Sequence, residues 1–266
     1  MIARLATIPF IIWLAYVLYQ VYVNYDEEMR VWMVPPAIII AVLFLSGKEI
    51  DKWIFSKRGR DLDEESAAWL LRFSPVYRQM PEGEREDFRK RVRRVIDHTQ
   101  FIGMTGDKFP DDAGLALAQD QALLTRRKDW GIVDAYVLYG HPFLTPNRPE
   151  VVHSCEYEPE DKVVIVSAEQ LLPGFLDPLR YLNISLYTQA QALMASASFR
   201  EGLGELSLPG EDELLALLGM EAGFVRSWLG AEELDVFGLA VCGYFYQGEK
   251  MAEGFTELYG RLGEMF

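Results

Sequence analysis

The sequence predicts an α+β protein in which an N-terminal transmembrane helical hairpin, residues 1–60, precedes a helix-rich domain with a small β-sheet, residues 61–266. Three observations predict this fold class. Two long runs near the N-terminus contain no charged residue, and much of the remaining chain has apolar residues at helical spacing. Three short segments are instead rich in β-branched and aromatic residues, which is typical of strands.

The two uncharged runs cover residues 5–23 and 31–46. A helix needs about 20 apolar residues to cross a bilayer, so the first run is long enough and the second is slightly short. Residues 24–30 suffice for a tight turn, and Pro35 and Pro36 lie near the start of the second run, where a helix tolerates proline best. A cleaved signal peptide and a buried core helix are the alternatives. A signal peptide is disfavoured because a second apolar run follows and a small-residue cleavage site is missing. A buried core helix is disfavoured because residues 5–23 form a long, aromatic run without charge.

Lysine and arginine positions predict the orientation of this hairpin. Arg4 precedes the first run and a basic cluster at residues 48–60 follows the second, whereas residues 24–30 carry three carboxylates and one cation. Positive residues stay on the cytoplasmic side, so we expect two spans of an inner or plasma membrane with both termini in the cytoplasm. The basic cluster could also contact anionic lipid headgroups, although a topology signal alone explains it.

Charge limits the function of the second domain. The chain has a net charge of −14 and residues 1–60 carry a balance of +2, so residues 61–266 carry −16. Such a domain repels nucleic acid, which argues against nucleic-acid binding. It would attract basic partners, although solubility explains an acidic surface equally well. Cys155 and Cys242 are the only cysteines, too few for a disulfide scaffold and compatible with a reducing cytoplasm.

The domain is predicted to be mostly helical, with one small sheet. Helices are expected at residues 61–73, 83–98, 111–127, 178–200, 211–218, 222–229, 232–246 and 249–266. Strands are expected at residues 134–139, 151–157 and 162–167. Asp111 or Asp112 is expected to cap the third helix, and residues 202–210 are expected to form a loop.

Two segments resemble a known family. Residues 183–194 read Asn-Ile-Ser-Leu-Tyr-Thr-Gln-Ala-Gln-Ala-Leu-Met, and residues 236–246 read Val-Phe-Gly-Leu-Ala-Val-Cys-Gly-Tyr-Phe-Tyr. They resemble the MtfA family (Mlc titration factor A), zinc-dependent peptidases with the patterns N-x-x-L-H-E-F-A-H-x-L-D and E-F-F-A-V-A-S-E-Y-F-F. The letters shared with these patterns are Asn183, Leu186, Ala190 and Leu193 in the first segment, and Phe237, Tyr244 and Phe245 in the second. Weaker likeness at residues 135–143 and 163–174 extends the resemblance over about residues 70–266, which implies a zincin-like domain.

The letters that carry the family's chemistry have changed. Tyr187 and Gln191 stand where the family has its two histidine ligands, Thr188 replaces the catalytic glutamate, and Gly243 replaces the third ligand. A neutral phenol and an amide oxygen are poor zinc ligands, threonine is no base near neutral pH, and glycine has no side chain. The resemblance therefore implies a pseudo-peptidase without metal, cofactor or catalytic residue. The simpler alternative is an amphipathic core helix in which Tyr187 and Gln191 only pack.

We therefore expect a membrane-anchored, catalytically inactive relative of MtfA-type peptidases that acts as a protein-binding or regulatory module. The family's namesake binds a sugar-system repressor, which implies a regulatory partner, but no residue of this chain identifies the protein or peptide. A retained cleft would be lined by Tyr187 and Gln191. An active zinc metallopeptidase with displaced ligands is the main alternative, and it would need His98, His141 or His153 to converge with carboxylates. A structural membrane protein whose domain is an assembly platform is the third possibility.

Other candidate sites are weaker. Alternation along a strand puts His153 and Cys155 on one face and Glu156 on the other, which favours an exposed residue pair over a metal site. Cys242 lies in an apolar helical stretch, which predicts an inert buried thiol. Residues 202–204, Gly-Leu-Gly, lack the Lys-Ser/Thr of a phosphate loop.

Overall fold

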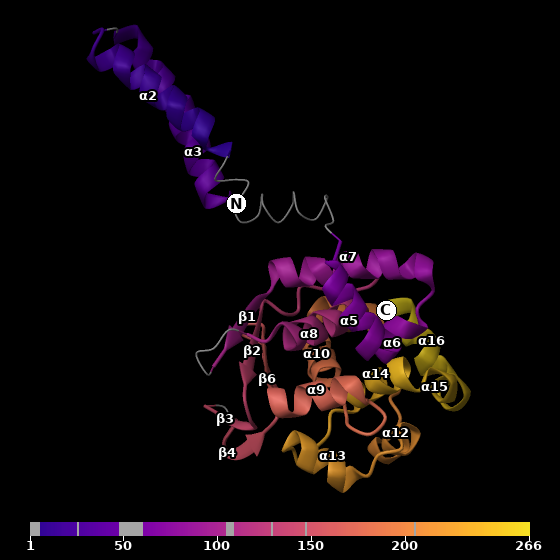
Figure 1. Cartoon of the computed structure of the whole chain (residues 1–266). Helices are drawn as coiled ribbons and strands as arrows, with labels where there is room; N and C mark the ends of the chain where they lie inside the picture. Colours follow the sequence, from indigo (N-terminus) through magenta and orange to yellow (C-terminus); the bar gives the residue numbers. More distant parts are fainter. Residues whose placement is uncertain are drawn as a thin grey trace. The chain divides into compact units, whose positions relative to one another are not determined.

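The structure, a computed structural model, describes residues 6–25, 27–47, 61–104, 109–128, 130–146, 148–204 and 206–266. The chain divides into two compact units, Met1–Arg60 and Asp61–Phe266 (Figure 1). The basic cluster predicted to set the membrane orientation, residues 48–60, lies outside the described residues, as does Arg4.

The first unit contains helix α2 (Ile8–Tyr22), the 3₁₀ helix η1 (Glu27–Met33) and helix α3 (Val34–Leu45). Both α-helices have a proline within their first two positions, where its missing N–H would be unpaired in any case. Helix α2 contacts both η1 and α3. The segment Glu28–Leu45 is long and apolar enough to cross a bilayer, judged by length and composition, whereas α2 is shorter.

The sheet of the second unit is mixed. Its strands are β1 (Gln100–Gly103), β2 (Ala135–Tyr139), β6 (Val163–Ser167) and β5 (Cys155–Glu158), in the order β1-β2-β6-β5. Strands β1, β2 and β6 are parallel, and β5 is antiparallel to β6 and forms one edge. Strands β3 (Phe143–Thr145) and β4 (Arg148–His153) form a separate antiparallel pair.

The other regular elements of the described domain are helices (Figure 1). They are α5 (Glu64–Phe73), α6 (Pro75–Gln79), α7 (Glu82–His98), α8 (Asp111–Leu124), α9 (Ala168–Leu176), α10 (Ile184–Ala195), α11 (Ala197–Leu203), α12 (Glu211–Leu218), α13 (Ala222–Leu229), α14 (Val236–Tyr246), α15 (Gly248–Gly254) and α16 (Thr256–Met265). The predicted α+β class, helix-rich with a small sheet, is therefore confirmed.

The predicted strand 151–157 is wrong, because it is two strands that meet at Ser154. The Ser154 N–H donates to the Leu229 carbonyl (2.9 Å), and Gly230 follows at close range. A Cβ on Gly230 would lie 2.1 Å from the Val152 carbonyl oxygen, and Gly230 has a φ of +67°, so only glycine suits this contact. The approach of this distant segment ends β4 and starts β5.

Several helix boundaries also differ from the prediction. Helix α8 is preceded by Pro110 rather than capped by Asp111 or Asp112, since both aspartates lie in its first turn. The predicted helix 178–200 begins only at Ile184, where the Asn183 side chain accepts hydrogen bonds from two backbone N–H groups. That range then breaks at Ser196, and the following helix α11 extends into the predicted 202–210 loop. The range 249–266 breaks at Phe255.

Helix α10 lies at the centre of the domain and contacts α8, α9, α14 and the strands β5 and β6. Its residues Leu186, Ala190 and Leu193 are fully buried. Helix α14 presents an apolar surface on every side, and this lets it pack between α10 and α12. Full burial of a leucine side chain stabilises the fold by about 1.5–3 kcal/mol, so α10 is held rigidly beside the edge strand β5.

Candidate functional site

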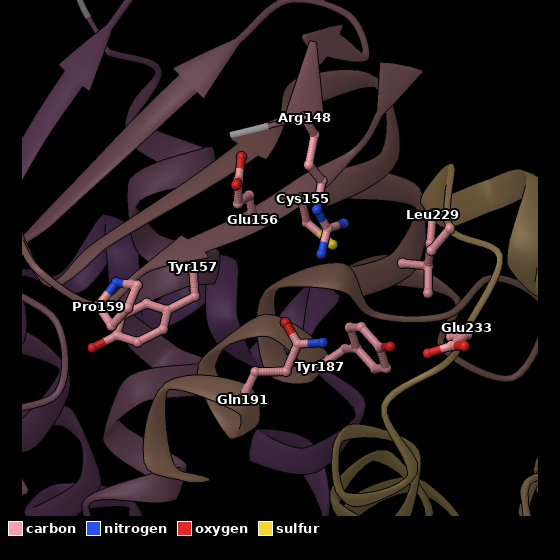
Figure 2. Close-up of a pocket in the computed structure, with 10 residues that line it drawn as sticks. Arg148, Cys155, Glu156, Tyr157, Pro159, Tyr187, Gln191, Leu229 and Glu233 are labelled. Carbon is pink, nitrogen blue, oxygen red and sulfur yellow. The ribbon is translucent and has the colours of Figure 1, made fainter. Parts of the chain in front are cut away.

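A pocket of about 210 Å³ lies between α10 and the edge strand β5 (Figure 2). Tyr187 and Gln191, which are one helical turn apart on α10, line it together with Cys155 and Tyr157 of β5. The remaining lining residues are Arg148, Glu156, Pro159, Leu229, Ala231 and Glu233. Two of the four positions picked out by the family resemblance thus lie in one pocket.

The other two positions do not line this pocket. Thr188 is fully buried, and its hydroxyl donates a hydrogen bond to the Ile184 carbonyl (2.7 Å). Gly243 faces away from α10, because a Cβ there would meet the side chains of Leu217 at 3.1 Å and Met251 at 3.6 Å. The structure therefore does not bring Gly243 to Tyr187.

Helix α14 instead approaches Tyr187 at Gly238. A Cβ on Gly238 would lie 2.6 Å from the Tyr187 ring, closer than any side chain tolerates. The Tyr187 hydroxyl accepts a hydrogen bond from the Asp235 N–H (2.7 Å), and the Asp235 carboxylate caps α14 by accepting from Gly238 N–H (2.6 Å). Burial raises the pKa of both Asp235 and Tyr187, so Tyr187 remains a neutral phenol.

The residues at this site do not fit a zinc ion. Zinc prefers thiolate, imidazole and carboxylate ligands, whereas α10 offers a neutral phenol and an amide. Among the residues that the structure describes, no three His, Cys, Asp or Glu side chains are grouped so that they could hold a metal ion. No hydrolytic step through zinc can be drawn from these groups.

Each histidine has a different neighbour. The Nδ1 atom of His98 lies 2.7 Å from the Arg94 carbonyl oxygen, and the Nδ1 atom of His141 lies 3.0 Å from the Glu169 carboxylate. His153 lies 3.0 Å from the carboxylate of Glu156 through its Nε2 atom. In these contacts no histidine lies next to another histidine.

The expected exposed pair of His153 and Cys155 is wrong. His153 is 1% exposed and Cys155 is 8% exposed, so both side chains are buried. Glu156 contacts His153, although strict alternation would place them on opposite faces, because the strand breaks at Ser154 between them.

Both thiols are protonated at neutral pH. Burial raises the pKa of Cys155 to about 11 and raises the pKa of Cys242 well above its ordinary value. The burial predicted for Cys242 is confirmed, and a protonated, buried thiol is expected to be a poor nucleophile.

Strand β5 has one edge paired with β6 and an outer edge that faces away from the sheet. The Ser167 N–H donates to the Ser154 carbonyl (2.8 Å), and Glu156 lies opposite Ile165 in the same ladder. Hydrogen bonds recur at every second residue of an antiparallel pair, so the backbone groups of Glu156 point toward β6. Those of Cys155 and Tyr157 point outward, and within the described part of the chain no other strand pairs with this edge.

This edge is the feature that the sequence does not reveal. Residues 151–157 read as one strand, but its break at Ser154 depends on a contact with Leu229, which lies about seventy positions away. Which edge of β5 stays unpaired depends on the register of β5 with β6. The residues that the sequence does indicate, Tyr187 and Gln191, lie beside it. No protein-family model matches this chain, and no curated protein matches it.

Proposed function

We propose that this protein is a membrane-anchored, catalytically inactive protein-binding module that holds an extended segment of a partner along the outer edge of β5. The observation that carries the proposal is that the backbone groups of Cys155 and Tyr157 point away from β6, beside a pocket lined by Tyr187 and Gln191. An unpaired strand edge is a template for another strand, and backbone hydrogen bonds give affinity while pockets for alternate side chains give specificity.

The size and chemistry of the pocket support a peptide ligand. Pockets for drug-sized molecules measure roughly 300–1,000 Å³, so a cavity of about 210 Å³ suits one or two side chains of a bound strand. Its α10 wall offers the Gln191 amide, which can donate and accept hydrogen bonds. The resemblance to MtfA-type peptidases supports the same reading, that of a zincin-like domain with a cleft but without ligands for zinc.

Binding can be tested with the full chain in detergent and a heptapeptide chosen from a randomised library by fluorescence anisotropy. Each peptide nitrogen is then methylated in turn, which removes one donor. We expect affinity to fall at every second position, by about fivefold for each lost hydrogen bond of about 1 kcal/mol. A loss that does not alternate would contradict strand pairing.

The absence of zinc chemistry is tested by the metal content of the full chain, purified with zinc supplied and then dialysed. We expect no retained zinc, because the donors at α10 are a phenol and an amide. About one zinc per chain would overturn the inactive assignment and favour a metallopeptidase with displaced ligands.

We further propose that the first unit is a two-span membrane hairpin with both termini in the cytoplasm. Large apolar side chains of this unit are exposed, such as Ile12 at 64% and Phe44 at 78%, as expected of surfaces that face lipid. Within the unit only Val17, Val21 and Pro36 are buried among the described side chains.

The turn between the helices offers a test of this topology. Tyr25 is 84% exposed, and the native thiols are buried. We expect Tyr25→Cys to react with a membrane-impermeant maleimide added outside intact cells. Labelling only after the cells are opened would contradict the orientation.

A further inference from the structure

Among the residues that the structure describes, Arg148 supplies the only positive charge in the lining of the pocket. Figure 2 shows its guanidinium beside the Cys155 sulfur, and the charge of Arg148 lowers the pKa of that thiol against the larger effect of burial. Arg148 lies at the start of β4 and is exposed. Within the described ranges, no hydrogen bond or ion pair joins its side chain to another residue.

The two negatively charged residues in the lining, Glu156 and Glu233, do not lie beside the Arg148 guanidinium. The Glu156 carboxylate lies 3.0 Å from His153, and Figure 2 shows it on the opposite side of β5 from Tyr157. The Glu233 carboxylate lies at the far end of Tyr187, where the tyrosine hydroxyl points toward it. Near Cys155, the charged group that has no ion-pair partner among the described residues is therefore the Arg148 guanidinium.

The register of a bound strand follows from the edge. Cys155 and Tyr157 present their backbone groups outward, so each would pair with one peptide residue, and these two peptide residues are separated by one other. Paired residues on neighbouring strands share a face. The side chains of Cys155 and Tyr157 face α10, so the paired peptide side chains also enter the pocket, and the one opposite Cys155 meets Arg148.

We propose that the pocket selects partner segments with an aspartate or glutamate at the position opposite Cys155, and that Arg148 binds this carboxylate. The inference rests on the strand pairing proposed above. A guanidinium matches a carboxylate with two parallel N–H donors, which makes arginine specific for this group. Selection is local, because the domain as a whole carries a charge of −16 and repels acidic peptides.

The probes are capped heptapeptides of alternating threonine and valine, with one glutamate, one glutamine or one lysine moved through every position. Their affinity for the full chain in detergent is measured by fluorescence anisotropy. The variants are Arg148→Gln and Arg148→Glu, and Arg200→Gln is a matched control that removes an exposed cation outside the pocket lining. Because Arg148 is exposed, its replacement leaves the core intact, and thermal unfolding of each variant checks this.

We expect glutamate to bind about tenfold more tightly than glutamine at one position, with no preference at the two adjacent positions, whose side chains face away. Arg148→Gln should abolish the preference, and Arg148→Glu should favour lysine at that position, while Arg200→Gln should change neither. Peptides that bind without a charge preference, or with one that survives Arg148→Gln, would overturn the role of Arg148 and leave strand pairing intact. If no peptide binds, the proposed function fails and this inference fails with it.

Discussion

Helix α10 carries polar side chains on two sides, and they have different surroundings. On one side, Asn183, Ser185 and Gln189 join the side chain of Asp120 in a closed polar cluster inside the domain. On the other side, Tyr187 and Gln191 line the open pocket beside β5. Polar residues in a buried helix therefore do not by themselves indicate a functional site, because their partners decide whether they serve packing or binding.

The closed cluster is connected by hydrogen bonds. The Asn183 amide donates to the Asp120 carboxylate (3.0 Å) and to the Tyr246 hydroxyl (2.8 Å). The Gln189 amide donates to the Ser185 hydroxyl (2.9 Å) and to the Leu117 carbonyl (3.2 Å). Burial without a cationic partner raises the pKa of Asp120 to about 7, despite the hydrogen bonds that favour its charged form.

The largest effect expected is a dependence of stability on pH through Asp120. Because its folded pKa of about 7 exceeds the unfolded value, the stability it contributes is complete below about pH 4 and is lost as the pH rises to about 7. Asp120→Asn stays neutral, so its free energy of unfolding relative to the native protein should increase on the order of 4 kcal/mol between pH 4 and pH 8. Urea unfolding at several pH values measures this difference. A difference in the free energy of unfolding that stays constant with pH would show that folding does not raise the pKa of Asp120.

Gly238→Ala should disturb the pocket side next. The added Cβ would lie 2.6 Å from the Tyr187 ring and 3.1 Å from the Tyr187 carbonyl oxygen, so we expect a loss of stability of about 3 kcal/mol. Tyr187→Ala in the same chain removes the ring and should make the double variant more stable than the sum of the single effects. Strict additivity, measured by urea unfolding, would mean that the ring and Gly238 do not meet.

Gln189 and Gln191 give a matched comparison of the two sides. Gln189 is fully buried and donates two hydrogen bonds, so Gln189→Ala should cost about 2 kcal/mol. Gln191 is partly exposed in the pocket, so Gln191→Ala should change the free energy of unfolding by less than about 0.5 kcal/mol. Equal costs in urea unfolding would contradict the distinction between a closed and an open side.

Tyr187→Phe should have a smaller effect. The variant keeps the ring against Gly238 but leaves the Asp235 N–H without its acceptor, at a cost of about 1 kcal/mol. Tyr244→Phe, which removes a half-buried hydroxyl on α14 outside the pocket, serves as the control. A Tyr187→Phe variant as stable as the native chain would mean that water replaces the hydroxyl.

Gly243→Ala should have the smallest effect. The nearest atom to its Cβ is the end of a flexible leucine at 3.1 Å, and alanine gains about 1 kcal/mol over glycine within a helix. The two effects nearly cancel, so the unfolding midpoint and peptide affinity should both stay close to native values. A large loss of peptide affinity in Gly243→Ala would show that Gly243 belongs to the binding site.

Local patterns predict part of this fold. The run Val163-Val-Ile-Val is a buried strand, and the residues at positions 187 and 191 share a helix face through their spacing alone. Strand β1 is not predicted, because its four residues follow directly after α7 without a β-rich run. Helix α9 is not predicted either, since it contains Pro173 and Gly174, yet a Cβ on Gly174 would lie 2.5 Å from the Leu182 carbonyl oxygen. Packing against that segment overrides the local preference.

The site is less predictable than the fold. Helix α14 is apolar on every side, so its sequence cannot show whether Gly238 or Gly243 faces α10. The outward edge of β5 depends on its register with β6, and a shift of one residue would turn Glu156 outward instead of Cys155 and Tyr157.

Residue-resolved amide hydrogen exchange of the full chain, with and without the selected heptapeptide, tests the central proposal most directly. In the free protein we expect the amides of Cys155 and Tyr157 to exchange faster than those of Glu156 and Glu158, whose residues lie opposite Ile165 and Val163 in β6. On adding the peptide, the first two amides should become protected and the other two should not change. Equal protection of all four in the free protein, or a bound peptide that leaves Cys155 and Tyr157 unprotected, would contradict strand pairing at this edge.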